Sequence, residues 1–80
     1  MITSGQIKAA RALLGITATE LAQLAGVAYT TMVRLESSSG VPSGQVKTLD
    51  AVRKALEKAG IEFIGTPDDR PGVRLKTPSP

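Results

Sequence analysis

Two short segments with helical spacing of apolar residues meet at Gly26, with no proline and no long loop between them. The first segment follows Thr17, which forms a capping box with Glu20 and so marks a helix start. The second covers about residues 28–36, with Met32 among its inward-facing residues. This arrangement predicts two helices that cross at a steep angle through a turn of about three or four residues.

Small residues stand at the two positions where such a crossing is tightest. Ala22 lets the two backbones approach, and Gly26 suits a turn position that requires positive φ. Val27, Met32 and Leu35 then pack the second helix against the rest of the domain. The outer face of that helix, which carries Tyr29, Thr30, Val33 and Arg34, is left free.

The flanking sequence predicts two further helices. Thr3 and Gln6 form another capping box, and the helix that follows them ends at Gly15. Residues 37–44 form a loop rich in Ser and Gly. The last helix begins at Ser43 or Gly44 and ends at Gly60, and its apolar stripe consists of Val46, Leu49, Val52, Leu56 and Ala59.

After Gly60 the pattern changes to the alternation of β-strands. In residues 61–64 and 73–76, apolar side chains alternate with others along the chain, as in β-strands. Residues 65–72 between them are rich in turn-forming residues. We expect a mainly α fold: a helix-turn-helix domain of four helices over residues 1–60, a β-hairpin over 61–76, and a disordered tail over 77–80.

Composition excludes several kinds of chemistry. The chain of 80 residues has no cysteine and no histidine, which excludes disulfides, zinc sites of the usual ligand types and Ser–His or Cys–His nucleophiles. We expect no enzyme activity and no cofactor, because no acid/base cluster is evident and aromatic residues are few. No segment approaches the roughly 20 apolar residues of a membrane span, so a cytoplasmic location without membrane association is expected.

The positive charge is concentrated in the helical part. Residues 1–60 hold seven Lys and Arg against four Asp and Glu, whereas residues 61–80 hold three of each. This asymmetry favours a polyanionic partner, although a net charge of +3 is also common among ordinary proteins.

The sequence resembles the phage-repressor-like family of helix-turn-helix regulators, also called the xenobiotic-response-element family. The likeness covers about residues 3–60 and is carried by ARALLG (10–15), TELAQLAGV (19–27) and TTMVRLE (30–36). The resemblance implies a helix that enters the major groove of DNA, with Tyr29, Thr30 and Arg34 reaching bases. Arg34 suits guanine, whose O6 and N7 accept both hydrogen bonds of a guanidinium.

Phosphate contacts are expected at the starts of helices, where free N–H groups and the helix dipole attract anions. The residues placed for such contacts are Thr17, Thr19, Ala28 through its N–H, Thr31 and, near the start of the last helix, Lys47. Many members of the family have Gln at the position of Ala18 and a capping Ser at the position of Ala28.

Structural alternatives exist for several charged residues. The resemblance matches Arg11 and Glu36 to a structural ion pair instead of a DNA contact. Tyr29 and Arg34 could belong to an ordinary solvated face. Asp50 and Lys54, and Arg53 and Glu57, are spaced four residues apart on a helix, where opposite charges pair on the surface. Ordinary surface pairing is therefore the alternative to DNA contact for four other cations, Lys8, Arg53, Lys54 and Lys58.

The hairpin carries more apolar surface than a two-stranded ribbon in water tolerates. We therefore predict that hairpins from two chains meet in a homodimer, and the alternative is that the ribbon caps its own helices. The predicted interface consists of Ile61, Phe63, Ile64, Val73 and Leu75.

Together these features predict a sequence-specific regulator of transcription, most simply a repressor, that binds double-stranded DNA as a homodimer. The alternative is an antitoxin-like or adaptor module that binds another protein and in which DNA binding is secondary or lost.

Overall fold

The computed structural model of the protein describes residues 1–38, 40–42 and 46–76. These residues form four helices followed by one antiparallel hairpin, which confirms the predicted fold class. The elements are α1 (Ser4–Leu14), α2 (Ala18–Ala25), α3 (Tyr29–Ser37), α4 (Val46–Lys58), β1 (Ile61–Thr66) and β2 (Asp69–Leu75). The predicted start of the last helix at residue 43 or 44, and the predicted tail at 77–80, lie outside the described residues.

Both predicted capping boxes are present. Thr3 and Gln6 close the start of α1, and Thr17 and Glu20 close the start of α2, each with the two reciprocal hydrogen bonds of the motif. Gly26 adopts the left-handed conformation at φ 71°, as the tight turn between α2 and α3 requires. These local signals explain why the boundaries of α1 and α2 agree with the sequence pattern.

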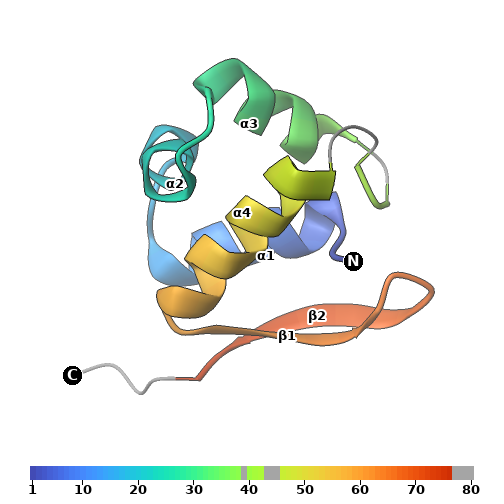
Figure 1. Ribbon diagram of the computed structural model, residues 1–80. Helices are drawn as coiled ribbons and strands as arrows, with labels where there is room; N and C mark the ends of the chain where they lie inside the picture. Colours follow the sequence, from blue (N-terminus) through green and yellow to red (C-terminus); the bar gives the residue numbers. More distant parts are fainter. Residues whose placement is uncertain (39, 43–45, 77–80) are drawn as a thin grey trace.

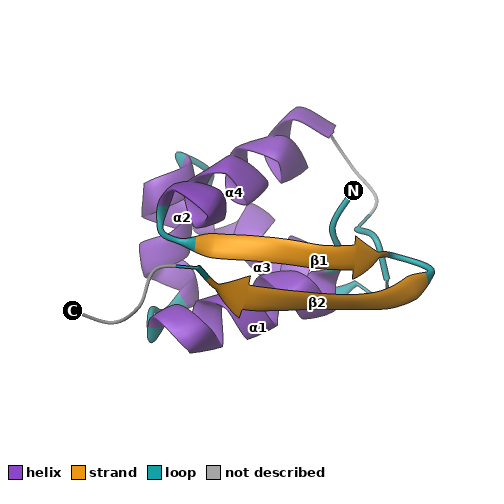
Figure 2. Ribbon diagram, turned by 90° about the horizontal axis from the view of Figure 1, so that it is seen from below, coloured by secondary structure: helices purple, strands orange, loops and turns teal. Residues whose placement is uncertain are grey.

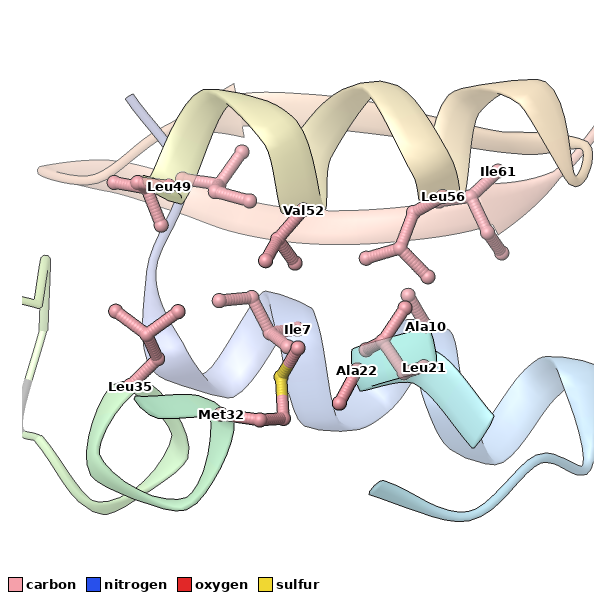
Figure 3. Packing of buried hydrophobic residues seen from close by; sticks show 11 residues of the cluster. Ile7, Ala10, Leu21, Ala22, Met32, Leu35, Leu49, Val52, Leu56 and Ile61 are labelled. Carbon is pink, nitrogen blue, oxygen red and sulfur yellow. The ribbon is translucent and has the colours of Figure 1, made fainter. Parts of the chain in front are cut away.

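One hydrophobic core joins the four helices to the hairpin (Figure 3). Its centre is formed by Ile7 of α1, Leu21 of α2, Met32 of α3 and Val52 of α4, all of which are fully buried. Ala22 is also buried, in agreement with its predicted place at the contact between α2 and α3. None of the helices in the described ranges combines the length and apolar character needed to cross a membrane.

The hairpin covers the face of the bundle opposite α3 (Figure 1). Viewed from below, β1 lies beneath α4 and β2 beneath α1 (Figure 2). Its strands are longer than predicted, because Thr66 pairs with Asp69 and only Pro67 and Asp68 form the loop. The ladder is irregular between Ile64 and Thr66, where Gly65 has a φ of 74°. A Cβ at Gly65 would lie 2.2 Å from the backbone oxygen of Arg70, so this irregularity requires glycine.

The prediction that the apolar face of the hairpin forms a dimer interface is wrong for Ile61 and stays a prediction for the other four residues. Ile61 is 1% exposed and belongs to the core, and Phe63 and Val73 pack against that core. The protein's own α1 and α4 pack against the apolar face of the hairpin. This packing corresponds to the alternative in which the hairpin caps the helices of its own chain. Ile64 and Leu75 are the most exposed of the five, at 38% and 36%, and Phe63 and Val73 remain partly exposed.

The side chain of Gln6 forms hydrogen bonds between the start of α1 and the hairpin. The Gln6 amide oxygen accepts a hydrogen bond from the N–H of Thr3 at 2.8 Å, which completes the capping box. Its amide nitrogen donates to the backbone oxygens of Ile64 at 3.2 Å and Gly72 at 2.9 Å. Gln6 itself is 4% exposed; its bond with Thr3 is buried, and its two bonds to the hairpin are partly buried. The start of α1 and the middle of the hairpin therefore share one buried polar group.

Candidate nucleic-acid interface

Helix α3 has one buried face and one exposed face. Met32 and Leu35 point into the core, at 0% and 5% exposure (Figure 3). Tyr29 is 53% exposed, and Thr30 and Arg34 are also exposed. The structure thus brings the three predicted base-reading residues together on one accessible face of the same helix.

Val33 also lies on this face, at 40% exposure. It follows Tyr29 by four residues and Thr30 by three, and such residues are neighbours on a helix surface. The sequence pattern had placed Val33 outward but gave it no role.

Three contacts hold the C-terminal part of α3 against α1. The Arg11 guanidinium binds both carboxylate oxygens of Glu36, through Nε at 3.0 Å and Nη2 at 2.9 Å. The hydroxyl of the buried Ser4 donates to the backbone oxygen of Leu35. These bonds fix the direction of α3 independently of its apolar packing, and the structural reading of the Arg11–Glu36 pair fits this geometry.

The ion pair is only partly shielded. The side chain of Arg11 is 28% exposed and that of Glu36 is 10% exposed. The hydrogen bond to Glu36 is the largest cause that raises the pKa of Arg11 above its usual value, although burial opposes it. Arginine is charged at every ordinary pH, so the Arg11 side of this contact keeps its charge throughout.

The start of α3 has unsatisfied backbone donors. Ala28 occupies the N-cap position and offers no side-chain hydrogen bond, and the first turn contains no acidic residue. The N–H groups of Tyr29, Thr30 and Thr31 have no partner within the helix, as in every first turn. They add to the positive end of the helix dipole, beside the exposed face of α3. Thr31 itself is half-buried.

The start of α2 is less suited to phosphate than the sequence suggested. The Thr17 hydroxyl accepts a hydrogen bond from the Glu20 N–H at 3.1 Å, and the Glu20 carboxylate accepts one from the Thr17 N–H at 2.8 Å. A carboxylate therefore already stands at this helix end, which weakens its attraction for a second anion. The N–H groups of Ala18 and the exposed Thr19 remain in the first turn.

Two cations of α4, Arg53 and Lys54, form ion pairs along the helix. Arg53 bonds to Asp50 at 2.6 Å and to Glu57 at 2.9 Å, and Lys54 bonds to Asp50 at 3.0 Å. These contacts confirm the predicted i,i+4 pairs and add an i,i+3 pair. They also hold the pKa of Asp50 below its usual range, chiefly through the Arg53 hydrogen bond. Lys47 is exposed at the second position of α4.

A serine at position 28 is expected to stabilise the domain. The backbone there is already extended, at φ −68° and ψ 147°, which is the conformation that a capping serine requires. Ala28→Ser should raise the free energy of unfolding by about 1 kcal/mol and the melting temperature by about 4–8 °C. Thermal unfolding followed by circular dichroism measures this change. Ala28→Val, which offers no capping oxygen, is the control and should not be stabilised, and an Ala28→Ser protein that melts with the original would show that the start of α3 does not accept a cap.

A comparison with models of known protein families gives no match for this chain, and a comparison with curated protein sequences gives none either.

Proposed function

We propose that the protein is a sequence-specific DNA-binding regulator that inserts the exposed face of α3 into the major groove. The observation that carries this proposal is the contrast between the two faces of that helix. One face is fixed by Met32, Leu35 and the Arg11–Glu36 pair, and the other exposes Tyr29, Thr30 and Arg34. A short helix held so firmly, with polar and cationic side chains on its free side, suits the reading of base edges.

The position of α3 adds support. It lies on the face of the bundle opposite the hairpin, so neither strand covers its outer side (Figure 1). The free N–H groups of its first turn suit a phosphate next to the groove, and Thr19 and Lys47 would provide further backbone contacts. The protein acts, in this proposal, by occupying an operator in the cytoplasm without chemistry, most simply as a repressor.

We propose further that two copies bind one operator. A single helix of nine residues reads only a few base pairs, whereas a twofold pair reads two half-sites about 34 Å apart. The apolar hairpin face is already packed on the protein's own helices, so contacts between copies would involve the exposed Ile64 and Leu75 or would form only on DNA. Light scattering of the protein alone and with its selected duplex distinguishes these two routes.

Selection of bound duplexes from random DNA tests the function directly. The proposal predicts enrichment of a palindromic site, and an affinity that falls steeply with salt concentration because phosphate contacts release counterions. A protein that enriches no sequence, or whose binding is insensitive to salt, would favour the alternative of a protein-interaction module.

Arg34→Ala is expected to remove one element of this specificity. The variant should lose its base preference at one position in each half-site, at a cost of about 1–3 kcal/mol for the preferred base. Because Arg34 is exposed, the variant should fold as the original does. Selection from the same random pool measures the change, with Lys54→Ala as a control that removes a cation from α4. Equal base preferences in Arg34→Ala and the original protein would exclude Arg34 from base reading.

A further inference from the structure

Val33 is an apolar residue at the centre of a face that the proposed function assigns to DNA. Along the helix it is bracketed by the predicted base readers, Thr30 one turn before it and Arg34 directly after it. A β-branched side chain has few rotamers in a helix, so Val33 presents two methyl groups in a nearly fixed direction. Tyr29, four residues earlier and 53% exposed, extends this apolar surface toward the start of the helix.

The hydroxyl groups nearest to Val33 on the C-terminal side are already engaged. The Ser37 hydroxyl donates to the backbone oxygen of Val33 at 2.6 Å, and the Ser38 hydroxyl donates to that of Arg34 at 3.3 Å. These two serines are therefore less free to bond to bases than their position suggests. The groups of this part of α3 that are left to contact DNA are the guanidinium of Arg34 and the methyl groups of Val33.

We propose that Val33 is a specificity-determining residue that recognises the 5-methyl group of a thymine in each half-site. This inference rests on the proposed function. In the major groove, thymine alone among the four bases presents a methyl group, and apolar side chains are the groups that contact it. Val33 and Arg34 are consecutive residues, about 3.8 Å apart at Cα, and stacked base pairs are separated by about 3.4 Å. The thymine should therefore lie within about one or two base pairs of the guanine that Arg34 reads.

Replacement of single thymines by uracil in the selected duplex tests this inference, because uracil differs from thymine only by the absence of the methyl group. For the original protein, one thymine per half-site should show a loss of affinity of about 4-fold on conversion to uracil, the equivalent of about 0.8 kcal/mol for one buried carbon group. Val33→Ala, which lacks both γ-methyl groups, should bind the thymine and uracil duplexes equally. Val33→Ile, which keeps the apolar branch, should retain the preference.

Thr30→Ala tests the competing assignment, in which the methyl group of Thr30, on the same face of α3, contacts the thymine instead of Val33. If the preference for thymine persists in Val33→Ala and disappears in Thr30→Ala, the inference is overturned. It is also overturned if no thymine of the selected site is sensitive to uracil. Failure of the proposed function has a different signature, because the original protein would then enrich no duplex at all. Unchanged thermal unfolding of Val33→Ala and Thr30→Ala confirms that the comparison is made between folded proteins.

Discussion

Gln6→Glu is expected to lower the free energy of unfolding by about 2–4 kcal/mol at neutral pH, although glutamate is a favoured residue at this position of a capping box. A carboxylate can still accept the hydrogen bond from the Thr3 N–H. It cannot donate to the backbone oxygens of Ile64 and Gly72, which the Gln6 amide nitrogen contacts at 3.2 and 2.9 Å. The substitution would place a buried negative charge against two carbonyl oxygens.

The pH dependence of this variant tests the cause. Burial and the facing carbonyl groups should raise the pKa of the introduced carboxyl in the folded protein, because only its protonated form can donate a hydrogen bond there. A raised pKa in the folded state means that the loss of unfolding free energy in Gln6→Glu is largest at high pH. This loss shrinks as the pH falls through that pKa. Urea unfolding at several pH values measures the effect. Gln6→Ala, which removes the bonds without adding charge, should lack this extra pH dependence, and a Gln6→Glu protein as stable as the original at neutral pH would contradict the role of Gln6.

Met32→Ala is expected to cost about 2–5 kcal/mol of stability. The side chain is fully buried and joins α3 to the core between α1 and α4 (Figure 3). Its loss leaves a cavity directly beneath the proposed reading face, so α3 would lose part of the support that fixes its direction. We therefore expect DNA affinity to fall as well, even though Met32 cannot touch DNA.

Denaturant unfolding and DNA binding should be measured on the same preparations of Met32→Ala. Val33→Ala is the matched control for stability, because it truncates the next residue of the same helix at an exposed position and should change the free energy of unfolding by well under half as much. Equal losses of stability in the two variants would mean that α3 is not anchored through Met32.

The parts of the fold that local rules govern could be predicted from the sequence. The capping boxes of Thr3 and Thr17 and the left-handed Gly26 involve residues within one helical turn, so their neighbours in the sequence specify them. The inner and outer faces of α3 followed from the same helical period. The exposed cluster of Tyr29, Thr30 and Arg34 therefore required no tertiary information.

Long-range contacts could not be predicted in this way. The sequence shows that the hairpin has an apolar face, but it does not show whether another chain or the protein's own helices cover it; α1 and α4 do so. The bonds from Gln6 to Ile64 and Gly72 join residues 58 and 66 positions apart, and the residue types suggest only a helix cap. The strand ends were wrong because turn-forming residues dominate 65–72, whereas the register is determined at Gly65.

The resemblance supplied what no local rule could: a partner for Arg11. It implied a pair with Glu36, and the two side chains form a bidentate contact across 25 positions of sequence. What the sequence reading did not weigh is that the capping residue Glu20 places a negative charge at the start of α2. The start of α3, which has no acidic residue, is consequently the better anion site of the two.

Amide chemical-shift mapping with the selected duplex is the most direct test of the central claim, that the outer face of α3 lies against DNA. We predict that the largest changes occur at Tyr29, Thr30, Val33 and Arg34, with smaller changes at the first turn of α2 and little change in β1 and β2. Changes confined to the hairpin, with the amides of α3 unmoved, would contradict the claim.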